Sequence, residues 1–253
     1  MKIDVVPEKL GSPISYSVLL LITAIVIIFH IVVNISKDSD ALVYGFSMII
    51  PAIVSIFAFI TVRRYAGTLV YSRAYKMLGI AFLLMFSAEF TYFVYEQILK
   101  LEPYPSIADL FFFVFYPMVL LYLIINIRFF APKITKIGII TIVGTPLVTT
   151  LVYLYLALSD FGSFDFYYGV IFVAAASTTL GFSIHTARIF RGGLIGTAWL
   201  VLVIGIILDV VGDTWYYYLE INDGYTLDNP VNLCWYSAYL LILYSLYKHK
   251  KSL

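Results

Sequence analysis

Charged residues are scarce in this sequence. Only 12% of its 253 residues are Asp, Glu, Lys or Arg, and 62% are hydrophobic, whereas soluble domains contain about 25% charged and about 45–50% apolar residues. The mean hydropathy is correspondingly high, at +0.97. This composition excludes an ordinary soluble domain and predicts an integral membrane protein.

Sequence motifs for common metals and cofactors are also missing. Cys234 is the single cysteine, which excludes an intramolecular disulfide and a cysteine-based metal cluster. The chain contains three histidines, with no HExxH pattern, no P-loop and no GxGxxG stretch. We therefore predict neither a bound metal nor a cofactor. The alternative is a hard cation held by Asp209 and Asp213, four residues apart, with Glu89 opposite. The net charge of +1 gives no indication of nucleic-acid binding.

Long apolar runs make up most of the chain. About 20 apolar residues in a helix are enough to cross a hydrocarbon core of about 30 Å, and backbone in lipid must satisfy its own hydrogen bonds. We therefore predict a single all-α transmembrane domain over residues 1–253, whose first span is retained rather than cleaved as a signal peptide. The eight predicted spans are 17–36, 41–62, 77–98, 107–128, 136–157, 165–187, 194–219 and 229–247.

The basic residues predict the orientation of these spans. Fourteen of the sixteen Lys and Arg residues lie at the two termini or in alternate loops, and only Lys37 and Lys100 lie in the opposite loops. Cytoplasmic loops of membrane proteins carry an excess of Lys and Arg. We therefore expect a multi-pass protein of the cell membrane with both termini in the cytoplasm. The fourteen are Lys2, Lys9, Arg63, Arg64, Arg73, Lys76, Arg128, Lys133, Lys136, Arg188, Arg191, Lys248, Lys250 and Lys251.

The two halves of the chain resemble each other weakly. A shift of 124 residues aligns Glu89 with Asp213 without a gap. Membrane folds often contain such duplications. Each half has four spans, an even number, so residues 14–130 and 134–250 are interpreted as parallel repeats related by an axis along the membrane normal.

Acidic residues interrupt two of the apolar spans. In and just before "VVGDTWYYYLE", residues 210–220, a spacing of four, three and four places polar side chains on one face of the seventh helix, and the third helix has a similar face. An acid near the bilayer centre costs about 2.5–3.5 kcal/mol on insertion scales, so these acids are expected to face the bundle interior or a water-filled cavity. The two faces consist of Asp209, Asp213, Tyr216 and Glu220, and of Glu89, Tyr92 and Glu96.

Polar residues of other spans are predicted at a similar depth. His30, Tyr116 and Tyr236 belong to the first, fourth and eighth spans. We expect them to converge with the acids in one outward-facing polar chamber, in which Glu89 and Asp213 point toward each other from neighbouring third and seventh spans. A structural role is the alternative: the acids would then accept hydrogen bonds from tyrosine and tryptophan side chains, and His30 would be a hydrogen-bonded core residue.

A first family resemblance lies in "YPSIADLFFFVFYPMVLLYL", residues 104–123, with its Pro-Ser, Ala-Asp and later Tyr-Pro pairs. It resembles a motif in polytopic membrane regions that precede diguanylate cyclase domains in bacteria and that also occur as stand-alone archaeal membrane proteins. The resemblance implies a sensory or ligand-binding membrane module. Because no cyclase sequence follows Lys251, we expect any signal to pass to a separate membrane-protein partner.

A second resemblance rests on the acids of the third and seventh spans, together with "GD" at 212–213 and "WYSAYLLI" at 235–242. This pattern is similar to that of the eight-helix lysoplasmalogenase family, and it implies that Glu89 and Asp213 correspond to that family's paired acids for vinyl-ether hydrolysis. One carboxyl would act as general acid, while its partner would stabilise the resulting cation or activate water.

Three functional hypotheses follow. The first is a non-enzymatic protein, surrounded by membrane lipid, that binds or senses a small-molecule or lipid-derived ligand or is a subunit of a larger membrane assembly. The second is an ether-lipid hydrolase that uses Glu89 and Asp213. The third is a cation or proton transporter, although the cytoplasmic halves of the third and seventh spans carry few polar residues. The predicted ligand-binding residues are Glu89, Asp209 and Asp213 as charged anchors, with Tyr92, Tyr116, Tyr216, Tyr236 and His30 around them.

Overall fold

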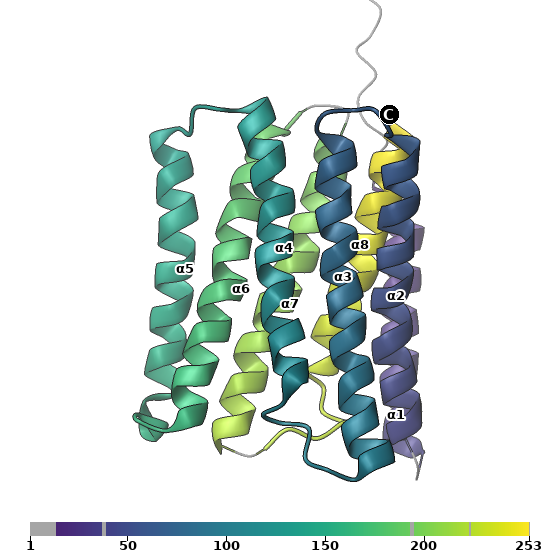
Figure 1. Ribbon diagram of the computed structural model, residues 1–253, viewed down its shortest axis with the longest axis vertical. Helices are drawn as coiled ribbons and strands as arrows, with labels where there is room; N and C mark the ends of the chain where they lie inside the picture. Colours follow the sequence, from purple (N-terminus) through teal and green to yellow (C-terminus); the bar gives the residue numbers. More distant parts are fainter. Residues whose placement is uncertain (1–13, 37–38, 193–194, 223, 253) are drawn as a thin grey trace, which may run out of the picture.

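The computed structural model describes residues 14–36, 39–192, 195–222 and 224–252, with the backbone alone for residues 251 and 252. Within these described residues, eight long helices run up and down in one bundle (Figure 1). They are α1 (Tyr16–Ile35), α2 (Asp40–Arg64), α3 (Tyr71–Phe93), α4 (Ile107–Phe130), α5 (Lys136–Leu156), α6 (Phe164–Ile189), α7 (Gly196–Asn222) and α8 (Asn232–Ser252). A π-helical turn, η1 (Val94–Leu99), continues α3, and a 3₁₀ turn, η2 (Leu158–Asp160), follows α5.

Within the described residues, seven helices, α1 to α7, are long and apolar enough to cross a membrane. This confirms the prediction of an all-α, polytopic membrane protein. The eighth predicted span does form a helix, but α8 is less apolar because it contains four tyrosines, Asn232 and several basic residues near its end. It packs against α1, α2 and α7, and polar side chains within such bundles normally face other helices.

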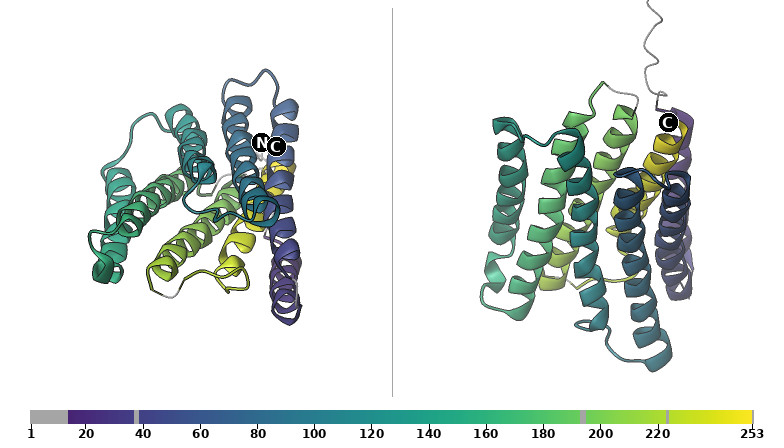
Figure 2. Two further views of the ribbon diagram at one scale, coloured as in Figure 1. Left: turned by 60° about the horizontal axis from the view of Figure 1, so that its bottom comes forward. Right: turned by 45° about the horizontal axis from the view of Figure 1, so that its top comes forward.

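Six of the helices form a closed ring, which Figure 2 shows obliquely from one end. Around the ring, α2 packs on α3, α3 on α4, α4 on α6, α6 on α7, α7 on α8, and α8 on α2. Outside it, α1 packs on α8 and α5 packs mainly on α6. These two outer helices bury few side chains and expose many large apolar ones. Their outer faces are suited to contact with lipid.

Close contact between α7 and α8 depends on two glycines. An added Cβ at Gly205 would lie 2.9 Å from the carbonyl oxygen of Ala238, and one at Gly212 would lie 2.7 Å from Nε1 of Trp235. Small residues at such positions let the backbones of membrane helices approach closely. Gly212 thereby leaves the space in which the Trp235 indole lies beside α7.

Charge differs between the two ends of the bundle. The first turn of α1 and the last turn of α8 lie at one end, together with the α2–α3, α4–α5 and α6–α7 loops (Figure 1). At the opposite end, which we call the acidic end, Lys100 is the one basic side chain among the described residues. The predicted orientation makes the acidic end extracytoplasmic, and it stays a prediction.

The third helix differs from the predicted span 77–98 at both ends. It begins earlier, at Tyr71, and its last part changes to a π-helical turn from Val94 to Leu99. Hydropathy predicts where a chain is apolar, but it does not report the hydrogen-bond register of a helix. Among the residues used for the topology prediction, Lys2, Lys9 and Lys37 lie outside the described residues, as do residue 194 of the seventh span and the side chain of Lys251.

Candidate functional site

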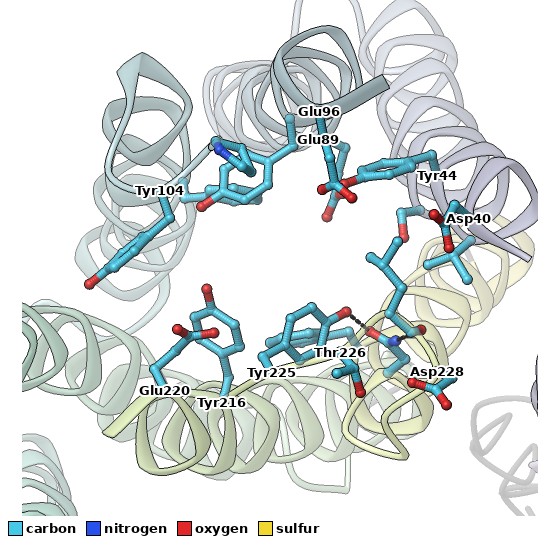
Figure 3. A pocket seen from close by; sticks show the side chains of 18 of the residues that line it. Asp40, Tyr44, Glu89, Glu96, Tyr104, Tyr216, Glu220, Tyr225, Thr226 and Asp228 are labelled. Carbon is cyan, nitrogen blue, oxygen red and sulfur yellow. Dashed lines mark hydrogen bonds between the residues drawn. The ribbon is translucent and has the colours of Figure 1, made fainter. Parts of the chain in front are cut away.

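A cavity of about 990 Å³ lies inside the ring at the acidic end. All six ring helices contribute to its wall, as do Val33 and Asn34 of α1, and residues 101–104 and 224–228 of two loops contribute at the acidic end. Figure 3 shows acidic and tyrosine side chains projecting from several sides into one open space. Ligand cavities commonly measure about 300–1,000 Å³, so this one has room for a sizeable organic molecule.

Most of the predicted site residues lie in this wall. Asp209 and His30 are the two that do not. Asp209 is 5% exposed, one turn from Asp213, and accepts no hydrogen bond from the described residues. His30 borders a small crevice between α1 and α8 beside the cavity. The six residues in the wall are Glu89, Tyr92, Tyr116, Asp213, Tyr216 and Tyr236.

The third and seventh helices are not packed neighbours, contrary to expectation. In the described chain, α3 packs on α2 and α4, while α7 packs mainly on α6 and α8. The cavity lies between them, and both Glu89 and Asp213 belong to its wall. The two carboxyl groups therefore share a cavity rather than a helix–helix interface.

Asp213 is held by two donors from different helices. The hydroxyl of Tyr116, in α4, donates to one carboxylate oxygen at 2.5 Å, and Nε1 of Trp235, in α8, donates to the other at 3.1 Å. Asp213 is only 8% exposed. Hydrogen bonds to a buried carboxylate offset part of its desolvation cost. Asp213 is thus a fixed acidic group in the cavity wall.

Asp109 and Glu96 also have partners. Asp109 accepts the backbone N–H of Ser106 at 2.5 Å, which completes a capping box at the start of α4. Its other carboxylate oxygen accepts the hydroxyl of Tyr92 at 3.2 Å. Glu96 accepts the hydroxyl of Tyr44. Tyrosine donors from the cavity wall thus compensate both acids.

Glu89 differs from these acids. It lies on α3, partly exposed in the cavity wall, and Figure 3 shows its side chain directed into the cavity. No hydrogen bond from the described residues reaches its carboxyl group. An ionised carboxylate in such a position requires water, a proton or a cation to compensate its charge. Glu89 is therefore the least compensated acid deep in this wall.

Two loop tyrosines that the sequence reasoning missed contribute to the cavity wall. Tyr104 donates its hydroxyl to Asp165 at 2.8 Å, and Tyr225 donates to Oδ1 of Asn232 at 2.9 Å. Burial, followed by the hydrogen bond to Asp165, raises the pKa of Tyr104, and burial raises the pKa of Tyr225. Both phenols therefore remain protonated near neutral pH. Helical periodicity could not have found them, because both lie in loops.

An aromatic layer closes the cavity toward the opposite end of the bundle. Tyr239 and Met85 line the cavity, and the Tyr239 hydroxyl donates to the Met85 sulfur at 3.5 Å. Next to them lies Phe82, fully buried, with its ring edge-on to those of Phe115 and Tyr239 at 5.3 and 5.7 Å. The cavity therefore has a largely aromatic floor.

No group of three or more His, Cys, Asp or Glu side chains in the described part of the chain is placed to hold a metal ion. Comparisons of the chain with protein-family models, curated proteins and solved structures find no match. The two family resemblances therefore stay predictions. The fold and composition define a polytopic helical membrane protein with seven candidate spans.

Proposed function

We propose that this protein binds a small-molecule or lipid-derived ligand in the cavity at its acidic end. The observation that carries the proposal is the cavity itself. It measures about 990 Å³, is lined mainly by the six ring helices, and has in its wall the carboxyl group of Glu89, which accepts no hydrogen bond from the described residues. A bundle without a ligand function gains nothing from such a space, because apolar packing would stabilise it more. Glu89 and Asp213 are the proposed charged anchors.

Recognition or sensing is better supported than transport. A conduction path needs polar groups beyond the cavity, whereas the floor consists of Phe82, Phe115 and Tyr239 in edge-on contact. The asymmetric lining, polar at the acidic end and apolar below, suits a ligand that enters and leaves at the same end. Uptake into proteoliposomes that depends on Glu89 would instead favour the transporter hypothesis.

The test is a cryo-EM map of the full-length protein purified in a detergent with an uncharged sugar head group. The proposal expects density for a co-purified molecule in contact with Glu89, and mass spectrometry of the extracted sample should identify it. A cavity that contains only water, or one closed by rearranged tyrosine and tryptophan side chains, would contradict it.

Hydrolysis of an ether lipid is the second candidate, because Glu89 and Asp213 line the same cavity. It predicts that the purified protein releases an aldehyde from a lysoplasmalogen and that Asp213→Asn abolishes the release. Asp160→Asn is the matched control, since Asp160 lies in η2, outside the cavity wall. Equal release by wild type and Asp213→Asn would remove the catalytic assignment.

The parallel-repeat hypothesis for residues 14–130 and 134–250 is supported by the order of the ring. The run α2, α3, α4 is followed by α6, α7, α8, and the junction of α4 with α6 has its counterpart in that of α8 with α2. The outer helices depart from this symmetry, since α5 packs on α6 but α1 packs on α8. Duplication would explain why equivalent acids, Glu89 and Asp213, face one cavity.

A further inference from the structure

We infer that the ligand of this cavity is an organic cation, whose ammonium group lies against Glu89 and the aromatic side chains near it. The inference rests on the proposed function and adds the charge and chemical class of the ligand. Four features carry it: the distribution of acids, their unequal compensation, their spacing and the aromatic content of the wall.

The acids of the chain are concentrated at the cavity. The structure describes eleven acidic side chains, and eight of them line it. Asp160, Asp165 and Asp209 are the other three. Lys100 is the one basic residue of the described wall. A cavity with this imbalance concentrates cations and repels anions, including the phosphate of a phospholipid head group.

Among the acids of the inner cavity wall, Glu89 is the one that receives no hydrogen bond from the described residues. Asp213 accepts two hydrogen bonds, from Tyr116 and Trp235, and Asp109 is held by its capping box. Glu89, which is partly exposed to the cavity, accepts none from the described residues. A cation in the cavity would supply the compensation that the described residues do not.

The geometry favours an organic cation over a metal ion. A metal site needs several ligands within about 2–2.6 Å of one point, but no three acidic or other metal-ligating side chains in the described chain converge in this way. The acids are instead spread around about 990 Å³. An extended molecule can occupy this space, whereas a single ion would leave most of it to water.

The wall also contains the aromatic rings that bind ammonium groups. Tyr225 and Tyr236 line the same cavity as Glu89, and Figure 3 shows Tyr216 and Tyr225 on the side of the cavity opposite Glu89. The face of an aromatic ring attracts a cation within about 6 Å of its centroid. A carboxylate on one side and phenol rings on the other are complementary to an alkylammonium group.

Binding of choline to the full-length protein in maltoside micelles tests this inference. Choline carries a quaternary ammonium group, and its uncharged isostere 3,3-dimethyl-1-butanol has the same shape. The readout is isothermal titration calorimetry, supported by the rise in thermal stability that a bound ligand produces. We expect saturable binding of choline and binding of the isostere weaker by at least about tenfold.

Two variants with the same change in net charge locate the site. Glu89→Gln should weaken choline binding at least about tenfold, whereas Asp160→Asn should leave it unchanged. A cooperative unfolding transition verifies that the Glu89→Gln protein is folded. Should that variant not fold, Tyr225→Leu replaces it, with the same expected loss. A cationic lipid with a trimethylammonium head group distinguishes a lipid ligand from a free one. If this lipid competes with choline, a lipid head group can occupy the site; if it does not compete, the ligand is a free organic cation.

Four results would overturn the inference: no choline binding, equal binding of the isostere, unchanged affinity in folded Glu89→Gln, or displacement of choline by equimolar Mg²⁺. Different results would reject the proposed function. A co-purified uncharged molecule in the map, combined with no choline binding, would leave the proposed function intact and reject the cation. A water-filled cavity that also binds no choline would reject both.

Discussion

The substitution Tyr116→Phe tests the central polar contact of the bundle. It removes the hydroxyl that donates to Asp213 at 2.5 Å and keeps the aromatic ring, which packs edge-on against Phe115 and Phe172. The variant isolates one hydrogen bond because the volume of the side chain barely changes. Trp235 still donates to the other oxygen of Asp213.

The free energy that this hydrogen bond contributes to stability depends on the charge of its acceptor. A neutral hydrogen bond between membrane helices contributes about 0.6 kcal/mol on average and about 1.7 kcal/mol at most, whereas one to a charged group contributes about 1.5–3 kcal/mol. Tyr116 and Asp213 are both buried, at 6% and 8% exposure, so bulk water cannot readily replace the lost donor. We expect Tyr116→Phe to lower the free energy of unfolding by about 2 kcal/mol.

The assay is equilibrium unfolding in mixed micelles, followed by tryptophan fluorescence and circular dichroism. A double-mutant cycle with Asp213→Asn separates the hydrogen bond from other effects. In the Asp213→Asn background, the same Tyr116→Phe change should cost less, about 0.6 kcal/mol, because its acceptor is then neutral. Tyr167→Phe, at an exposed position of α6, is the control and should leave the unfolding free energy unchanged.

Two outcomes would refute this reasoning. A loss below about 0.5 kcal/mol in Tyr116→Phe would mean that water replaces the donor or that the contact is not made. Equal losses with Asp213 and with Asn at that position would mean that Tyr116 contributes through packing alone.

Three further predictions concern other parts of the molecule. Gly212→Ala should displace the Trp235 indole, lower the free energy of unfolding by about 1–3 kcal/mol and shift the tryptophan emission; an unchanged spectrum would contradict the close approach. Glu89→Gln should stabilise the ligand-free protein by about 1 kcal/mol or more, since it removes an uncompensated carboxylate; a loss of stability would show that Glu89 has a partner. In a Cys234→Ser background, a membrane-impermeant maleimide should label Asp160→Cys but not Arg191→Cys in intact cells, and the reverse pattern would invert the orientation.

The positions of the helices could be predicted from the sequence because the signal is local. Crossing a hydrocarbon core requires about 20 consecutive apolar residues, and each such run is visible without knowledge of its neighbours. Seven of the eight predicted spans form helices that meet this requirement, and α8 is a more polar helix enclosed on three sides. The π-helical turn at Val94–Leu99 was not predictable, since its register depends on local backbone geometry.

The candidate site was predictable only in part. Helical spacing predicted two polar faces, one that carries Glu89 and Tyr92 and one that carries Asp213 and Tyr216, and the structure places these four residues in the cavity wall. The same spacing put Asp209 on that face, although the structure buries it outside the cavity wall. Asp209 lies only one helical turn from Asp213. Periodicity predicts the face of a helix on which a residue lies, but it does not predict how far along the helix the cavity extends.

The sequence by itself determined that the protein lies in a membrane, that its fold is all-α, and on which helix faces the acids lie. These properties depend on composition and on residue spacing within a few turns of one helix. The tertiary structure decided that six helices close into a ring and that α3 and α7 stand apart across a cavity. It also decided which acids are compensated. The donors to Asp213 come from α4 and α8, up to 97 residues away, while Glu89 receives none from the described chain. Such compensation depends on how separate helices meet, and no local pattern in the sequence encodes it.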